Sequence, residues 1–383
     1  MWIGGVIYFF GICIALVTNK LYIIERGLCG IGIGILIPID ITLCSEISFV
    51  MIRGGFFSFS ICVLFLSFII CEITVLFVGT QLSIVVHYVS LVLCFILLFA
   101  LFSPVDPYSY IIRQRLSHKQ TDLEDNSTTS LLNNMEDIRG NLYEKVVDFY
   151  GEDSADYRTD RLYEQYIYEQ QEGRRTIFKH TWFYIIFSVS SFLFSIFVSR
   201  NRVLYRTVYC LNELGYTYES NTIEIIHNSV ISFVALIFAF LIDKINRKVL
   251  SLVGVSILAF VFLVYSLRSF FSDILIDTPY IYIDLILSLL YDASLGGIVF
   301  PCTLVFSQEY LPLSYRYLYS IIETILFLSL LSCQNVLSNY IAEYTSSGVL
   351  YFLSFIYCLY YICLLTVIKD TKGKYLEDII DYE

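Results

Sequence analysis

Long apolar runs, each about the length that a helix needs to cross a bilayer, recur along nearly the whole chain. A helix crosses about 30 Å of hydrocarbon with roughly 20 apolar residues. Roughly ten runs approach this length. They lie near residues 2–18, 27–44, 55–78, 82–103, 181–199, 223–242, 249–267, 279–306, 318–336 and 347–368. With 57% hydrophobic and 15% charged residues, the chain has too little polar surface to cover a water-soluble globule. The sequence therefore predicts an all-α, polytopic membrane protein.

The distribution of basic residues predicts the orientation of these runs. With a cytoplasmic amino terminus, the cytoplasmic segments hold the long polar loop and most of the Lys and Arg outside it, namely Arg53, Lys244, Arg247, Lys248, Arg316, Lys369, Lys372 and Lys374. The opposite side keeps Lys20, Arg200, Arg202, Arg206 and Arg268. This asymmetry follows the positive-inside rule, so we expect the amino terminus in the cytoplasm.

A polar segment divides the runs into two unequal groups. We expect a partial transmembrane half of four spans at 1–104, a cytoplasmic loop with short helices at 105–179, a transmembrane half of six spans at 180–368, and a cytoplasmic tail at 369–383. Within the loop, 160-DRLYEQYIYEQQEGRR-175 has the pattern of a short amphipathic helix on the membrane surface.

Enzymatic, cofactor and nucleic-acid functions find no support in the sequence. The four histidines, His87, His118, His180 and His227, are scattered without metal-ligand spacing. We find no nucleophile motif, no phosphate-binding glycine loop and no basic aromatic stripe. Ten of the eleven cysteines lie in or near apolar runs, where they act as small hydrophobic residues. We therefore expect no enzymatic activity, no cofactor and no nucleic-acid partner.

Two charged pairs with the same internal spacing lie at junctions between apolar runs. In 45-SEISFVMIRG-54, Glu46 precedes Arg53 by seven positions, and in 308-QEYLPLSYRY-317, Glu309 precedes Arg316 by the same interval. Both pairs fall on the predicted cytoplasmic side. Such repetition is typical of transporters built from parallel internal repeats, although each pair could instead cap a helix end in the headgroup region.

These pairs belong to a longer series of motifs. Arg26, Gly30, Gly34, Glu46, Arg53 and Gly54 fall in one register in 25-ERGLCGIGIGILIPIDITLCSEISFVMIRG-54. They are followed in order by 104-PVDPYSY-110, 243-DKINRK-248, 309-EYLPLSYR-316 and 369-KDTKGKYLED-378. In this order and spacing the chain resembles the sugar-porter family of the major facilitator superfamily, nearly from end to end.

The resemblance implies the major facilitator superfamily fold, with about ten transmembrane helices that correspond to family spans three to twelve. The run at 1-MWIGGVIYFFGICIAL-16 is similar to the third span, so the first two spans are absent, either because the reading frame lost its start or because the protein is reduced. The implied function is transport of a hexose or related small solute by alternating access. The alternative is a non-transporting sensor, partner subunit or degenerate paralogue that keeps the fold.

In the family, acidic and basic residues at the cytoplasmic ends of the two halves form a network that closes the inner gate. The resemblance assigns this role to Glu46, Arg53, Asp243, Arg247, Glu309 and Arg316. Helix capping is the alternative role for these six residues.

The family's sugar contacts are largely replaced. Asn201 matches a family asparagine whose amide binds sugar hydroxyls, and it is the substrate-binding residue that the resemblance implies. Other contact positions carry Ile61, Ile231, Leu304 and, nearby, Leu331, which offer no hydrogen bonds. Arg200 and Arg202 flank Asn201 and could serve an anionic substrate or simply end the helix at the outer face.

Four acids, Asp40, Asp284, Asp292 and Glu323, lie in or near predicted spans, where an ionisable group is a functional-site hypothesis. Some could instead lie near the interface or be neutral. The expected partners are a sugar-like solute and the lipid bilayer, with proton coupling left open. The family's commonest location is the plasma membrane.

Overall fold

The computed structural model describes residues 2–17, 27–32, 52–78, 200–215, 220–270, 278–310 and 347–373, with short pieces at 24, 45, 139–140, 143–144, 146–147, 156–162, 164, 186, 190, 320–322 and 325. Within these residues the chain is helical apart from short turns. The helices are α1 (Trp2–Val17), α3 (Arg53–Val78), α8 (Arg200–Glu213), α9 (Ser220–Leu241), α10 (Arg247–Phe270), α11 (Thr278–Ser294), the π-helical turn η2 (Leu295–Val299), α12 (Phe300–Glu309) and α14 (Ser347–Val367). The expected all-α architecture is therefore confirmed.

Five helical segments of the described chain are long and apolar enough to span a membrane: Arg53–Ile70, Thr222–Leu241, Arg247–Phe270, Tyr282–Glu309 and Gly348–Val367. They match five of the predicted runs. The run near 82–103, and most of those near 27–44, 181–199 and 318–336, lie outside the described residues.

The outward faces of these helices are apolar. On α9, Phe233 and Phe240 are 65% and 69% exposed, and on α11 Ile286 is 65% exposed. Exposing such an apolar surface to water is unfavourable in free energy, whereas lipid tails solvate it well. The exposed aromatic and aliphatic side chains therefore fit helices embedded in a bilayer.

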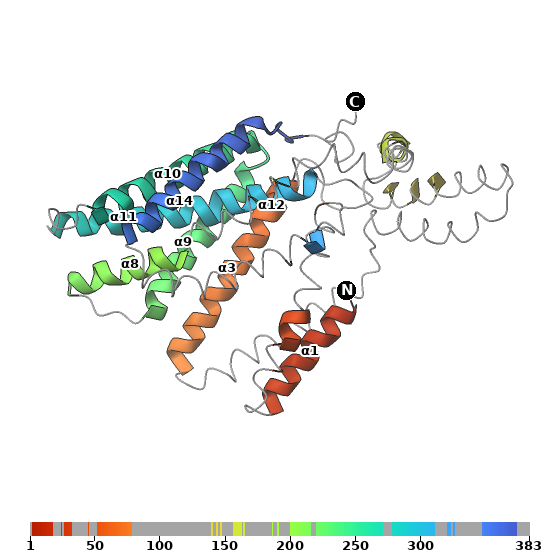
Figure 1. Cartoon of the computed structure of the whole chain (residues 1–383). Helices are drawn as coiled ribbons and strands as arrows, with labels where there is room; N and C mark the ends of the chain where they lie inside the picture. The colour runs from red at the N-terminus through yellow and green to blue at the C-terminus, as the bar shows by residue number, and fades with distance from the viewer. Residues whose placement is uncertain are drawn as a thin grey trace.

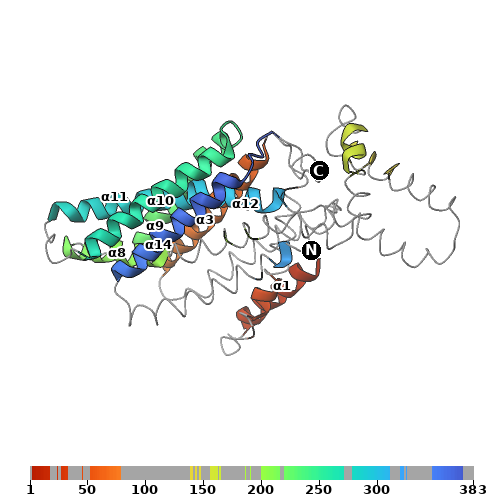
Figure 2. The same cartoon turned by 45° about the horizontal axis from the view of Figure 1, so that its top comes forward.

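The helices group into one packed body, from which α1 stands apart in both views (Figures 1 and 2). Helix α3 packs along α9, and α10 packs along α14. The core between α10, α11, α12 and α14 is rich in aromatic side chains, including Phe262, Tyr265, Tyr291 and Tyr361.

The segment from Thr278 to Glu309 is one continuous helical path with a π-helical turn at its middle. Two glycines in this turn allow α9 to approach closely. A Cβ atom at Gly296 would lie 2.4 Å from Cγ2 of Ile231, and one at Gly297 would lie 2.2 Å from Cγ1 of Val234. The glycines thus set the distance between η2 and α9.

Helix α8 lies beyond the predicted end of the apolar run near 181–199. The apolar run was expected to end near residue 199, but the described helix runs from Arg200 to Glu213. Val203, Thr207 and Cys210 are buried and recur at helical spacing on one face. A hydropathy window misses this helix because Arg200, Arg202 and Arg206 lower its mean hydropathy.

Residues 156–162 and 164 are helical, which covers the start of the short helix expected in the long loop. The rest of that expected helix lies outside the described residues.

Candidate functional site

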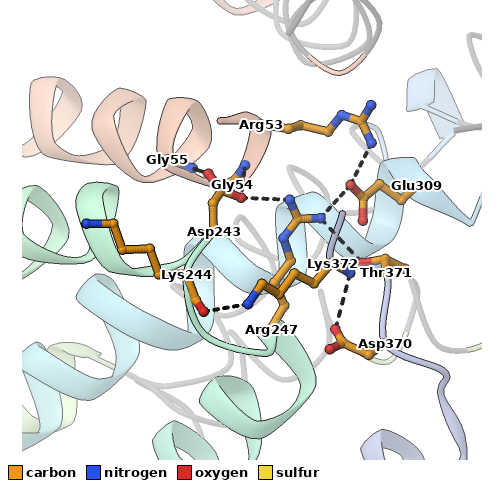
Figure 3. Close-up of polar contacts among 10 residues, drawn as sticks. All are labelled: Arg53, Gly54, Gly55, Asp243, Lys244, Arg247, Glu309, Asp370, Thr371 and Lys372. Atoms are coloured by element: carbon orange, nitrogen blue, oxygen red, sulfur yellow. Dashed lines mark hydrogen bonds and ion pairs between the residues drawn. The ribbon is translucent and has the colours of Figure 1, made fainter. Parts of the chain in front are cut away.

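A buried ion pair joins the first residue of α3 to the last residue of α12 (Figure 3). Nη1 of Arg53 donates to Oε1 of Glu309 at 2.8 Å, and both side chains are fully buried. These residues are 256 positions apart in the sequence. The pair therefore ties a helix before the predicted loop at 105–179 to a helix after it.

Arg247, the first residue of α10, binds two carboxylates at once. Its Nη1 donates to Oε1 of Glu309 at 2.6 Å, and its Nη2 donates to Oδ1 of Asp243 at 2.7 Å. One oxygen of Glu309 thus accepts hydrogen bonds from two arginines. We call Arg53, Asp243, Arg247 and Glu309 the junction cluster.

Asp243 also holds the beginning of α3. Its two carboxylate oxygens accept hydrogen bonds from the backbone N–H groups of Gly54, at 3.0 Å, and Gly55, at 2.6 Å. These N–H groups belong to the first turn, where a helix has no internal acceptors and carries partial positive charge. The absence of a side chain at Gly55 matters, because a Cβ atom there would lie 2.4 Å from the carbonyl oxygen of Ala239.

The junction cluster is formally neutral, with two arginines and two carboxylates. Burying charges is costly, and a buried pair stabilises a fold only when opposite charges meet with good geometry. Removing one partner would leave a buried charge without compensation. The arrangement is therefore stable when the helix ends meet and costly when a single member is lost.

The segment after α14 also reaches this region. Oγ1 of Thr371 accepts from Nη1 of Arg247 at 3.4 Å, and the Lys372 ammonium donates to the carbonyl of Lys244 at 2.5 Å. The hydroxyl of Tyr310 donates to the carbonyl of Lys369. The sequence motif at 369–378 was noted for its resemblance, but its contact with Arg247 was not predicted.

Four of the six residues assigned to a gate therefore meet in space, and two lie outside the described residues, Glu46 and Arg316. Asn201 lies in the first turn of α8, and its side chain also lies outside the described part of the structure. Asp40 and Glu323 are likewise outside it.

Asp284 belongs to a second charged group, near the opposite end of α10. Its Oδ2 accepts from Nη2 of Arg206 at 3.0 Å, and its Oδ1 pairs with Arg268 in the last turn of α10. The Arg206 guanidinium lies 4.9 Å from the centroid of the Tyr265 ring, a cation–π contact. We call Arg206, Arg268 and Asp284 the distal cluster. Sequence reasoning had selected Asp284 without finding these partners.

Polar contacts also run along the interface between α3 and α9. The hydroxyl of Ser58 donates to the carbonyl of Ala235 at 2.7 Å, and that of Ser232 donates to the carbonyl of Cys62 at 3.2 Å. Farther from the junction cluster, Asn228 of α9 meets Glu72 of α3, and the neighbouring His227 meets Asp292 of α11.

Three of the positions where the sequence resemblance places family sugar contacts, Ile61, Ile231 and Leu304, carry packed apolar side chains. Ile61 is buried in one cluster with Cys62 and Ala235, against which Leu304 also packs. Ile231 is 2% exposed. Among the described residues, no group of three or more His, Cys, Asp or Glu side chains could hold a metal ion.

The apolar spans, the glycine-mediated helix contacts and the charged junction define a multi-pass helical membrane protein. Residues 1–332 match the Major Facilitator Superfamily, and the chain belongs to that family. The expected fold and the expected superfamily are thus confirmed.

Solved structures show the same fold. The chain is similar to the proton:xylose symporter XylE bound to 6-bromo-6-deoxy-D-glucose, with a TM-score of 0.74 and 18% identity over 98% of this chain and 81% of that one. A double-tryptophan variant of XylE matches with the same TM-score and coverage at 17% identity. No curated protein matches the sequence.

Proposed function

We propose that this protein is a membrane transporter of the sugar-porter type, which moves a hexose or related small solute by alternating access. The junction cluster acts as its inner gate. The observation that carries this proposal is the single oxygen of Glu309 that Arg53 and Arg247 share. A contact of this kind fastens two groups of helices at one point, where a rocking motion can break and re-form it.

The two groups are the halves at 1–104 and 180–368, which the loop at 105–179 separates and the tail at 369–383 follows. Helix α3 belongs to the first half, and α9, α10 and α12 belong to the second. When the halves part at this end, all four side chains of the junction cluster lie at helix ends, where water can replace their partners. The unpaired charged groups then have a lower free energy than they would have at the centre of a bilayer.

Glu46 and Arg316 complete the gate in this proposal. Among the described residues, Nε and Nη2 of Arg53 and Oε2 of Glu309 have no hydrogen-bond partner. By charge alone, the carboxylate of Glu46 is a partner for arginines and the guanidinium of Arg316 is a partner for carboxylates.

The substrate class rests on the sequence resemblance and on the fold shared with XylE, whose structure holds a deoxyhexose derivative. Asn201 supplies an amide for a sugar hydroxyl. The apolar cluster around Ile61 and Leu304 leaves fewer hydrogen-bond partners than a sugar normally meets. Each buried hydroxyl without a partner costs about 1–3 kcal/mol, so we expect a solute with few hydroxyls or a shifted pose. We place the protein in the plasma membrane.

The same apolar cluster favours a second candidate function. A protein that kept the gate and lost its solute contacts would act as a sensor or partner subunit without net transport. The two candidates predict different results in one uptake experiment.

That experiment expresses the chain in cells that lack their own sugar transporters and screens hexoses, pentoses and polyols. The wild type is compared with Glu309→Ala and with the control Glu224→Ala, an exposed acid on α9. We expect uptake of at least one solute, preserved in the control and lost in Glu309→Ala. No uptake by wild-type protein that is displayed at the cell surface would refute transport and favour the second candidate.

A further inference from the structure

Four lysines lie where three candidate membrane spans have one of their ends. These spans are Thr222–Leu241, Arg247–Phe270 and Gly348–Val367. Each lysine is within a few residues of such an end, and the four are Lys244, Lys248, Lys369 and Lys372. Residues this close to the end of a span lie at the level of the lipid headgroups, to which lysine side chains extend. We call these four residues the lysine patch.

Hydrogen bonds connect the segments that carry the lysine patch. Nζ of Lys248 on α10 donates to the carbonyl of Thr366 near the end of α14 at 2.7 Å. Nζ of Lys372, after α14, donates to the carbonyl of Lys244 in the turn between α9 and α10 (Figure 3). An ammonium group has three N–H donors, so one such bond leaves two donors for a further acceptor. The α9–α10 turn and the segment after α14 therefore share one surface.

This surface has an excess of positive charge. Asp370 lies between the two lysines of the segment after α14 and contributes one negative charge against four positive ones. Asp243, in the adjoining turn, is engaged by Arg247 in the junction cluster, which is neutral as a whole. Lys244 and Lys369 are exposed, and the Lys244 side chain points away from Arg247 in Figure 3. Among the described residues, four lysines and one aspartate leave this surface with three uncompensated positive charges.

Exposed apolar side chains adjoin the lysine patch. They are Ile245, Val249 and Val367, which are 39%, 49% and 65% exposed. Ile245 follows Lys244 and Val249 follows Lys248 in the sequence. A surface that offers ammonium donors beside apolar side chains matches a phospholipid, which carries a phosphate and acyl chains on one molecule. Free phosphate would gain nothing from the apolar side chains.

We propose that the lysine patch binds the headgroup of an anionic phospholipid in the adjacent leaflet. Clusters of about four to eight basic residues directly beyond the end of a span attract anionic lipids. The predicted orientation places this surface in the cytoplasmic leaflet, which is the leaflet rich in anionic lipids.

A bound headgroup also supports the junction cluster. It binds lysines of the α9–α10 turn and of the segment after α14, and it thereby holds these two segments together. The turn carries Asp243, and the segment after α14 carries Thr371, whose Oγ1 accepts from Arg247. Anionic lipid therefore favours the closed junction. The effect on a gate rests on the proposed function, whereas lipid binding itself does not.

Lipid binding is tested on the full chain in micelles of an uncharged detergent. A phosphatidylserine with a fluorophore on one acyl chain is titrated with protein, and its fluorescence anisotropy gives the affinity. We expect unlabelled phosphatidylserine to compete, whereas phosphatidylcholine or inorganic phosphate at the same concentration should not. Competition by inorganic phosphate would show a site for free phosphate. Equal competition by phosphatidylcholine would show that the charge of the headgroup is not recognised, and either result overturns the proposal.

Charge variants then test whether the lysine patch is the site. Lys244→Gln combined with Lys369→Gln should weaken binding by roughly 30-fold, because each lysine near an anionic surface contributes a factor of about five. The corresponding double arginine variant should bind as the wild type does. Asp370→Asn should strengthen binding by about fivefold, a gain that a disturbed fold would not give. Arg139→Gln, which removes an exposed charge elsewhere, is the control.

Either of two results would overturn the site. One is wild-type affinity in the double glutamine variant, and the other is equal weakening in the Arg139→Gln control. If the double glutamine variant fails to fold, Asp370→Asn decides, since unchanged affinity in that variant also contradicts the site.

The effect on the junction is tested by linkage, because a lipid that favours the closed junction must bind less tightly when the junction is disturbed. Gly55→Ala changes no charge and places a Cβ atom 2.4 Å from the carbonyl oxygen of Ala239, which disturbs the approach of α3. It should lower the affinity for phosphatidylserine several-fold, whereas Gly30→Ala, with nothing within 4 Å of the added atom, should not. Equal affinities in the two variants would refute the link to the junction. Absence of solute uptake would refute the transport function, while the anisotropy measurements still decide the lipid site.

Discussion

The junction cluster and the distal cluster use the same chemistry in different places. Each pairs two arginines with buried carboxylate oxygens, and each involves an end of α10. The junction cluster connects α3 with α10 and α12, which follow the predicted loop, whereas the described ion pairs of the distal cluster connect α8, α10 and α11. Ion pairs between two groups of helices can open when the groups separate. Ion pairs within one group hold that group together throughout.

Burial also differs between the two clusters. Arg53 and Arg247 are 0% and 1% exposed, while Arg206 and Arg268 are 20% and 15% exposed. An arginine that reaches water loses less when its partner is removed. The two clusters should therefore respond unequally to neutralisation.

The largest expected effect comes from Glu309→Ala. Two fully buried arginines would lose the oxygen that they share, and breaking a buried pair in this way costs about 3–5 kcal/mol. Thermal unfolding of the purified protein in detergent should show a pronounced decrease in stability. Glu224→Ala serves as the control. A Glu309→Ala variant as stable as this control would show that the junction is weak.

Asp284→Asn should have the next largest effect. The amide keeps the shape of the side chain but loses its charge, and hydrogen bonds to charged groups contribute about 1.5–3 kcal/mol. Because Arg206 and Arg268 reach solvent, we expect the lower part of this range. The same unfolding measurement compares this variant with Glu309→Ala. A loss of stability in Asp284→Asn that equals or exceeds the loss in Glu309→Ala would contradict the expected order of the two clusters.

Gly55→Ala tests whether close helix approach supports the junction cluster. The new Cβ atom would lie 2.4 Å from the carbonyl oxygen of Ala239, a backbone atom that cannot rotate away. Overpacking of this kind costs about 1–3 kcal/mol and should reduce both stability and solute uptake. Gly30→Ala is the matched control, since nothing lies within 4 Å of the added atom there. Similar results for the two variants would refute close packing at Gly55.

The smallest effect is expected for Ser58→Ala. Its hydroxyl donates across the interface to the carbonyl of Ala235 at 2.7 Å, and one such bond contributes about 1 kcal/mol. Ser60→Ala is the control, because that exposed hydroxyl bonds only to Phe56 within its own helix among the contacts seen. If Ser60→Ala proved less stable than Ser58→Ala, this would contradict a stabilising contact between α3 and α9.

Charged motifs in the sequence indicated the junction cluster well. Arg53, Asp243, Arg247 and Glu309 were selected because their spacing resembles a known family, and the structure brings their side chains together. The role of Thr371 was not predicted, because a neutral side chain in a tail gives no periodic or charge signal.

Partners within the spans could not be predicted from the sequence in the same way. Asp284 and Asp292 were recognised as unusual acids, but hydropathy does not show which helix faces them. Arg206 was assigned to a loop beyond the helix end, and His227 was one of four scattered histidines. Their pairing depends on how α8, α9 and α10 rotate and pack against α11.

By itself, the sequence determined the all-α membrane architecture and the positions of the charged helix ends, because each depends on local hydropathy and on motif spacing along the chain. Only the tertiary structure decided that one oxygen of Glu309 serves two arginines, that Asp284 links three helices, and that His227 meets Asp292. These contacts arise from residues far apart in sequence, and their geometry is set by close helix packing, which no local pattern encodes.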